Sequence, residues 1–362
     1  MAVIQKAKET MTAKERVLKT FNFEKTDRVT IGYEANPVIH GKLLQALSVT
    51  AEELPYALGM DYRGVQAPYV GKMLFEELPD RRTDVLDGFH VRYVKNESGG
   101  YWDFCDFPLE GADSEQIYNY PVVNPDDFDY SVVSDKISAF KDFAICIGGP
   151  GMPDIINSMG RIMGMEDILC NLMLEDEATL SLVRRRADSY AQMLERTLEY
   201  NKGKIDFMWL GEDLGTQNTP MISLELYRKI LKPIHKQFVD IAKAYNIPAM
   251  FHTCGSSSWA YEDFIEIGVR GVDTLQPEAH NMSPRYLKEH FGGRLTFRGC
   301  ISTAGPLAYG TAGETDRVCK ETLEVMMDGY GYHFAPTHQI QDNTPPENII
   351  AMYQAAHKYG VY

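Results

Sequence analysis

The stretches DFMWLG (206–211) and PAMFHTC (248–254) flank one helix-like segment, and this unit decides the fold. Both are short, mainly apolar runs, a pattern typical of strands buried on both faces. Between them, apolar residues of 223–245 recur every three or four positions, which predicts an amphipathic helix that Pro233 should kink or interrupt. A strand, a helix and a second strand in this order favour parallel pairing of the two strands.

The same alternation runs along the whole chain. Six further segments have strand-like patterns and bring the total to eight: 29–33, 62–66, 144–149, 271–276, 295–300 and 332–337. A second long amphipathic helix is predicted over 176–200. Three shorter helices have start signals, namely Ser283 before Pro284, Thr311 with Glu314, and Thr344 with Glu347. Eight strand–helix units predict a (β/α)8 TIM barrel; a doubly wound sheet is disfavoured because no G-x-G-x-x-G follows a strand.

The chain is longer than such a barrel requires. Its 362 residues exceed the typical length of about 250. We assign the surplus to an N-terminal helical extension and to 81–121, where FHVRYV and YWDFCDF alternate like a β-hairpin with its turn at 97–100. Because no internal repeat or low-complexity linker divides the chain, we predict one α/β domain over 1–362 with an inserted hairpin at about 81–121.

The charge balance excludes several partners. Against 36 Lys and Arg stand 51 Asp and Glu, so the net charge of −15 would repel nucleic acid and anionic membranes. No apolar stretch approaches the ~18 residues that span a bilayer, and the N-terminal residues lack a hydrophobic signal core. The six cysteines are scattered, which indicates thiols or metal ligands rather than a disulfide framework. We therefore expect a cytoplasmic protein with neither nucleic acid nor membrane as a partner.

In a TIM barrel the active site lies at the carboxyl ends of the strands, and the fifth predicted strand ends in His252 and Cys254. Residues i and i+2 of a strand point to the same face, so this imidazole and thiolate could bind one metal ion. Zinc suits that pair best among common biological metals. The alternative is structural: Cys254 as a small buried apolar residue and His252 as a hydrogen-bonded core histidine.

Other strand ends also carry reactive side chains. His338 follows the last strand and can face the mouth from the opposite wall, although a lone histidine is often a surface residue. Cys300 ends the seventh strand and could ligate a metal or pack. Glu212 and Asp213 are adjacent, so only one can point into the site, as a ligand or general acid/base; the alternative for either is capping the following loop.

Aromatic residues near these ends could form the wall for a flat apolar ligand. Tyr33 and Trp209 are the candidates that we assign to substrate binding, together with Glu34 and Cys300. Trp209 lies inside a predicted strand, where packing in the core is the alternative role.

Seven motifs resemble the uroporphyrinogen decarboxylase superfamily in their order along the chain. They are DRVTIGYE, GGPGMPDIINSMGRIMGMEDIL, GEDLGTQ, FHTCGS, IEIGVRGVDTLQPEA, LTFRGCIST and FAPTHQIQDNTPPENI. The resemblance covers roughly 12–360, and it implies a TIM barrel with its site at the mouth. It also implies one of two chemistries: decarboxylation of uroporphyrinogen, or zinc-dependent methyl transfer to or from a corrinoid on a partner protein.

The arginine distribution discriminates between these chemistries. Uroporphyrinogen carries eight carboxylates, and true decarboxylases resemble one another in an arginine-rich N-terminal segment. This chain has no arginine between Arg28 and Arg63, and Glu34 stands where cationic groups would be needed. Decarboxylation is therefore the less favoured alternative.

The resemblance to the methyltransferase branch implies a set of zinc ligands. Its H-x-C motif maps onto His252 and Cys254, and a third ligand follows the last strand. Thiol-methylating members have a cysteine there, whereas this chain has His338. Exchanging a thiolate for a neutral imidazole makes the zinc a stronger Lewis acid, which suits activation of an ether oxygen.

The resulting hypothesis is a zinc-dependent methyltransferase that moves a methyl group from a methoxylated, for example aromatic, compound to cob(I)alamin on a separate corrinoid protein. Glu212, Asp213 and Gln276 would orient the substrate or a zinc ligand. The alternatives are a uroporphyrinogen-type decarboxylase, a barrel that binds a corrinoid or other tetrapyrrole without turnover, and a thiol methylase with Cys300 as the missing sulfur ligand. A homodimer is expected from the resemblance alone.

Overall fold

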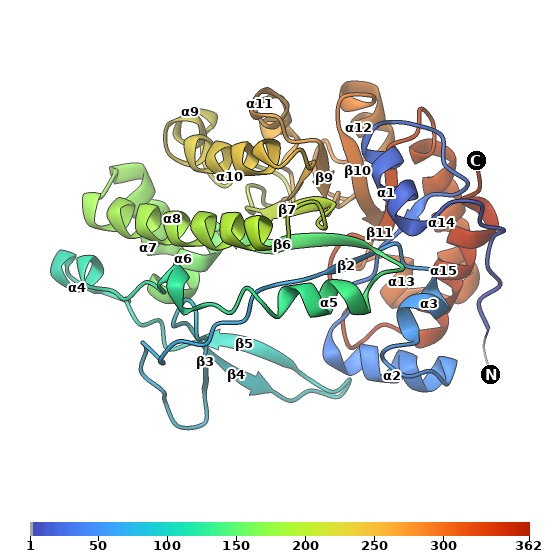
Figure 1. The fold of residues 1–362 in the computed structure, drawn as a ribbon. Coiled ribbons are helices and arrows are strands. Elements are labelled where there is room, and N and C mark those ends of the chain that lie inside the picture. The colour runs from blue at the N-terminus through green and yellow to red at the C-terminus, as the bar shows by residue number, and fades with distance from the viewer. Residues whose placement is uncertain (1–2) are drawn as a thin grey trace.

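Eight parallel strands form the central sheet of the computed structural model, which describes residues 3–362 (Figure 1). In sequence order they are β1 (Thr30–Ile31), β2 (Tyr62–Gly64), β6 (Ala144–Pro153), β7 (Phe207–Gly211), β8 (Ala249–His252), β9 (Gly271–Asp273), β10 (Thr296–Ile301) and β11 (Tyr332–Pro336). Their spatial order is β1-β11-β10-β9-β8-β7-β6-β2. Each lies within or overlaps a predicted strand, so the (β/α)8 barrel is confirmed.

The barrel closes between β1 and β2, the two ends of the sheet. No ladder joins these strands within the described residues, but the backbone N–H of Asp61 donates to the carbonyl oxygen of Ile31 at 3.0 Å. In return the N–H of Ile31 donates to Oδ2 of Asp61 at 2.7 Å. Asp61, the residue that precedes β2, is thus bonded to β1 by two hydrogen bonds.

Helices surround the sheet (Figure 1). They are α1 (Ala13–Phe21), α2 (Pro37–Leu47), α3 (Leu54–Leu58), α4 (Ser114–Tyr118), α5 (Val133–Ala139), α6 (Ile155–Met163), α7 (Met165–Leu174), α8 (Glu177–Tyr200), α9 (Leu224–Leu226), α10 (Lys232–Ala244), α11 (Tyr261–Ile267), α12 (Pro284–Phe291), α13 (Pro306–Tyr309), α14 (Ala312–Met326) and α15 (Pro346–Tyr359). Short 3-10 turns occupy Pro125–Asp127 and Ser258–Ala260. No helix of this described part of the chain is long and apolar enough to cross a bilayer.

Two helix predictions need correction or refinement. The predicted helix over 223–245 stays helical through Pro233, so the proline does not end it; a π turn at Tyr227–Leu231 changes the hydrogen-bond pattern between α9 and α10 just before the proline. The capping box of Thr344 with Glu347 is wrong, because α15 has Pro345 as its N-cap. Pro346 follows Pro345 and excludes it from the helical region, so the helix starts one residue later than the box requires.

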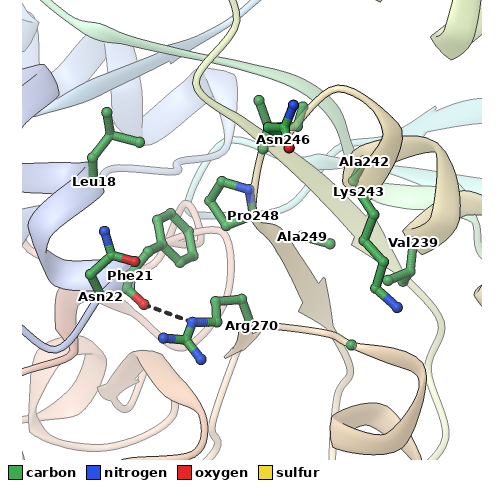
Figure 2. Close-up of a pocket in the computed structure, with 12 residues that line it drawn as sticks. Leu18, Phe21, Asn22, Val239, Ala242, Lys243, Asn246, Pro248, Ala249 and Arg270 are labelled. Atoms are coloured by element: carbon green, nitrogen blue, oxygen red, sulfur yellow. Dashed lines mark hydrogen bonds between the residues drawn. The ribbon is translucent and has the colours of Figure 1, made fainter.

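The N-terminal extension closes the bottom of the barrel. Phe21 of α1 packs against Phe207 and His333, with ring centroids 5.4 Å and 4.8 Å apart. A cavity of about 460 Å³ lies beside α1 at this end, where the Arg270 side chain donates to the carbonyl oxygen of Phe21 (Figure 2). It opens at the amino ends of the strands, opposite the end where TIM barrels place their active sites.

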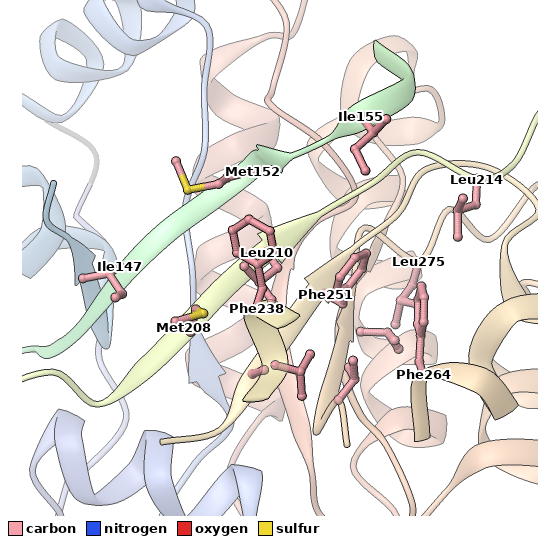
Figure 3. Close-up of a cluster of buried hydrophobic side chains, with 14 of the residues drawn as sticks. Ile147, Met152, Ile155, Met208, Leu210, Leu214, Phe238, Phe251, Phe264 and Leu275 are labelled. Carbon is pink, nitrogen blue, oxygen red and sulfur yellow. The ribbon is translucent and has the colours of Figure 1, made fainter. Parts of the chain in front are cut away.

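A second apolar layer fills the space between the sheet and the outer helices. Met208, Leu210 and Phe251 of β7 and β8 point toward Phe238 of α10 and Phe264 of α11 (Figure 3). The alternate residues of β7, Phe207 and Trp209, belong to a separate cluster inside the barrel. Strands β7 and β8 are therefore buried on both faces, which explains their unbroken apolar pattern.

The predicted hairpin forms a small separate sheet, seen below the barrel in Figure 1. It contains β3 (Arg82–Thr83), β4 (His90–Val94) and β5 (Tyr101–Cys105), all antiparallel. Its tip contacts a loop at the barrel mouth, because the N–H of Gly100 donates to Asp342 at 3.2 Å and Lys42 bonds both Ser98 and Asp342. The insertion is thereby fixed against the loop that follows β11.

Protonation of His333 should make stability depend on pH. Its ring is 1% exposed, and burial lowers its pKa from 6.5 to about 3. The unfolded chain takes up this proton first, so stability falls as the pH drops below about 6.5. We expect wild type to lose about 2 kcal/mol more than His333→Gln in free energy of unfolding between pH 7.5 and pH 5.

Urea denaturation of both proteins at the two pH values measures this difference. All other ionisable groups are present in both proteins, so their contributions to the pH dependence cancel. The exposed His290 offers a matched control, since His290→Gln should keep the pH dependence of wild type. Equal pH dependence of wild type and His333→Gln would contradict the assignment.

Candidate metal centre

Three side chains with metal-binding atoms converge at the ends of β7 and β8. Ligand atoms of Asp213, His252 and Cys254 all lie within 4.8 Å of one another. Nε2 of His252 is 3.4 Å from Sγ of Cys254 and 3.7 Å from Oδ1 of Asp213. The predicted pair of His252 and Cys254 is thus brought together, with a carboxylate beside it.

The neighbouring strand orients His252. The register of β8 and β9 places Asp273 beside His252, and their Oδ2 and Nδ1 atoms are 2.8 Å apart. A carboxylate only accepts, so Nδ1 carries the hydrogen of this bond, and Nε2, which faces Cys254 and Asp213, is the nitrogen that could bind a metal ion once its own proton is displaced. Histidine ligands of metals typically have such a carboxylate behind them.

Asp273 is itself held by two further side chains. The buried Arg298 guanidinium pairs with its Oδ1, and Nε1 of Trp209 donates to its Oδ2 at 3.1 Å. Burial raises the pKa of Asp273, but the charge of Arg298 and the bonds to His252 and Arg298 prevail and lower it to about 2. Asp273 is therefore a fixed negative charge behind the imidazole.

The donor set fits a zinc ion in its chemistry. Burial raises the pKa of the Cys254 thiol to about 11, although His252 acts in the opposite direction. Burial also opposes ionisation of Asp213, but the charge of His252 and the N–H of Cys254 lower its pKa overall. A divalent cation would supply the positive charge that stabilises the thiolate, and nitrogen, sulfur and oxygen are the ligand types that zinc accepts.

Of the two adjacent acids, only Asp213 lies at the metal centre. The Glu212 side chain is fully buried on the other side of the chain, where it accepts from the N–H groups of Ile155 and Ile156 at 2.7 Å and 2.8 Å. It therefore caps the amino end of α6, an earlier segment of the chain, and not the loop that follows Glu212, where the alternative given above placed such a cap. Burial raises its pKa to about 8, and Nε2 of His235 lies 3.3 Å away.

The group formed by Asp213, His252 and Cys254 opens into a pocket of about 460 Å³. Its walls are formed by Glu34, Ala35, Pro150, Gly151, Asp154, Asn157, Arg161, Asp213, His252, His338 and Gln339. His338 is exposed and lies outside the tight group, with its ring centroid 6.4 Å from that of His252. The structure therefore places His338 in the same pocket as His252.

The remaining predicted residues either line an adjoining cavity or lie outside both cavities. Tyr33 and Trp209 line an adjoining cavity that also includes Glu34. Gln276 donates to Gln217 at 2.9 Å and lines neither cavity. Cys300 is 1% exposed and also lies outside both, and burial raises the pKa of its thiol.

Four charged residues of the site were not predicted from the sequence. Asp273 and Arg298 are charges inside apolar strands, and such an interruption was the signal that could have identified them. Asp154 is 3% exposed and its Oδ1 has no hydrogen-bond partner among the described residues. Burial raises its pKa to about 8, with Glu212 and Asp213 adding to the effect.

Arg161, the fourth of these residues, connects the pocket to the inserted sheet. Its guanidinium is 3.5 Å from Oδ2 of Asp154 and stacks over Phe104 of β5, 4.9 Å from the ring centroid. The insertion therefore contributes to the support of the pocket wall.

Comparison with known proteins agrees with this architecture. A family model described as uroporphyrinogen decarboxylase (URO-D) matches residues 138–359. No curated protein sequence matches the chain. A methyltransferase from Methanosarcina mazei shares the fold with a TM-score of 0.64 and 17% identity, over 97% of this chain and 99% of that one.

Two further solved structures are less similar. Native xylanase 10B from Thermotoga maritima has a TM-score of 0.45 and 10% identity, over 96% of this chain and 98% of that one. A sugar phosphate isomerase/epimerase from Parabacteroides distasonis has a TM-score of 0.40 and 13% identity, over 92% and 96%.

Proposed function

The chain belongs to the uroporphyrinogen decarboxylase (URO-D) family, and from this premise we propose that it is a zinc-dependent methyltransferase. Its methyl donor would be a methoxylated compound, and the acceptor would be the reduced corrinoid of a partner protein docked at the barrel mouth. The observation that carries the proposal is the convergence of Asp213, His252 and Cys254 within 4.8 Å. The fold shared with the Methanosarcina mazei methyltransferase is consistent with it.

The residues of one wall would hold the zinc ion. We propose His252, Cys254 and Asp213 as ligands, with His338 completing the set from the facing wall. When bound, zinc would act as a Lewis acid that polarises the bond between the methyl carbon and its oxygen. Asp273 orients His252, and the N–H of Cys254 bonded to Oδ1 of Asp213 at 2.8 Å holds two of the ligands in register.

With Asp213 as a further ligand, the net charge of the zinc site differs from the charge that the ligands His252, Cys254 and His338 alone would give. Asp213 adds a negative charge beside the Cys254 thiolate, so the ligands would balance the charge of the ion. A carboxylate oxygen is nevertheless a harder donor than a second thiolate. This set of ligands would therefore still favour attack by the reduced corrinoid on an oxygen-bound methyl group over binding of a thiol substrate.

The decarboxylase alternative is disfavoured by the charges of the pocket. Glu34, Asp154 and Asp213 line it, and its one arginine, Arg161, already faces Asp154. A substrate with many carboxylates would find a single arginine on this wall, too few cations to pair with it. A barrel that binds a corrinoid without turnover differs from the proposal in transferring no methyl group.

Metal analysis and methyl transfer together test the proposal. We expect about one zinc ion per purified chain, loss of methyl transfer to cob(I)alamin after chelation, and recovery when zinc is restored. Cys254→Ala should lose both zinc and activity. Cys170 is exposed and does not belong to the ligand group, so Cys170→Ala is the matched control and should keep both.

Two results would contradict the proposal. One is a wild-type protein that transfers methyl groups without zinc. The other is a Cys254→Ala variant with full zinc content and wild-type activity.

A further inference from the structure

A second cavity of about 460 Å³ adjoins the pocket of the metal centre and shares Glu34 and Pro150 with it. It is lined by residues that follow β1, by β2, β6 and β7, and by α3. Most of its wall is apolar or aromatic, including Tyr33, Leu54, Pro55, Met60 and Trp209. Such a wall favours a flat apolar group of about the size of a substituted ring.

One cation on this wall has no acidic partner in the described part of the chain. Arg63 of β2 lines the cavity and makes neither an ion pair nor a side-chain hydrogen bond within residues 3–362. Its guanidinium stacks over the Phe140 ring, 4.5 Å from the centroid, which restricts its position. The nearby Asp142 instead accepts a hydrogen bond from Tyr56. In a chain of net charge −15, an arginine without an acidic partner in a cavity is a ready anion site.

The carboxylate of the cavity wall is already compensated, and the one imidazole of the wall, His40, is bonded through Nδ1 to the hydroxyl of Tyr33 at 3.2 Å. Glu34 lies 3.4 Å from the buried Arg298 guanidinium, so its negative charge is paired on the barrel side. Arg63 therefore supplies the unbalanced charge of the cavity. One cation suits a ligand with one anionic group, in contrast to a polycarboxylate.

We propose that this cavity binds the apolar body of the methyl donor and that Arg63 selects donors with a single anionic substituent. The inference rests on the proposed function, because the methoxy group would reach the metal centre through the side shared at Glu34 and Pro150. It adds a substrate class, an amphiphilic monoanion, and a specificity-determining residue.

Equilibrium binding to the zinc-containing protein tests the proposal without any corrinoid partner. The probes are 4-methoxybenzoate and its neutral amide, 4-methoxybenzamide. We expect wild type to bind the acid at least tenfold more tightly than the amide, and Arg63→Gln to bind both equally. Arg63→Lys should retain part of the preference, because it keeps the charge but not the planar fork.

The matched control is Arg285→Gln. Arg285 is an exposed arginine that lines neither cavity, and its variant should keep the wild-type preference. Equal binding of acid and amide by wild type, no binding of either, or an unchanged preference in Arg63→Gln would each overturn the proposal. Zinc content and methyl transfer are measured separately, so failure of the proposed function remains distinguishable from failure of this inference.

Discussion

Asp61→Asn is expected to lower the free energy of unfolding by about 3–5 kcal/mol, because it removes the one fully buried counterion that two buried guanidinium groups share. Asp61 is fully buried and pairs with Arg16 and Arg28, whose side chains are 1% exposed. Asparagine keeps the volume and can still accept from the N–H of Ile31, so the loss measures the charge and not a cavity. The closing contact between β1 and β2 weakens with it.

Chemical denaturation of the two proteins at pH 7.5 gives the difference. Asp240 is the control, an acid on α10 whose side chain is 46% exposed and pairs with Lys236 and Lys243 at the surface. Asp240→Asn should change the free energy of unfolding by no more than about 1 kcal/mol. A change that small in Asp61→Asn would show that Glu9 and Asp27 suffice as counterions for the two arginines.

The strands were predictable because burial on both faces produces apolar runs that differ from the helical period. All eight runs, from VTIGY at β1 to YHFAPT at β11, overlap a strand of the barrel. Their ends were less predictable. β6 continues to Pro153, past the predicted end at 149, because GPGMP pairs with β7 after a shift in register. Such a shift depends on the neighbouring strand and has no local signature.

The convergence of His252 and Cys254 was predictable, but the other residues around them were predictable only in part. The i, i+2 spacing of His252 and Cys254 put both on one face, as the structure shows. The same rule required Glu212 and Asp213 to diverge, but it could not say which one entered the pocket, because the phase of the alternation after Gly211 depends on how α6 packs. Asp273 required the register between two strands, which no local pattern contains.

Asp273→Asn is expected to weaken zinc binding by about 10- to 100-fold, the range typical for loss of a carboxylate behind a histidine ligand. The asparagine side chain would retain the volume and one hydrogen bond to Nδ1 of His252, but not the negative charge that raises the basicity of the imidazole. Competition with a chromophoric chelator at fixed pH measures the affinity of each protein, independently of any methyl transfer.

The same substitution removes a counterion from Arg298, so loss of stability alone must be separated from loss of metal affinity. Asp61→Asn provides that separation, because it removes the same kind of buried carboxylate–arginine pairing at a place that contacts no ligand of the metal centre. If zinc binds only because the fold is intact, both variants should lose affinity in proportion to their stability. If Asp273 acts through His252, Asp273→Asn should lose affinity while Asp61→Asn retains it, even when Asp61→Asn is the less stable of the two. Equal affinities in all three proteins would contradict a role for Asp273 in metal binding.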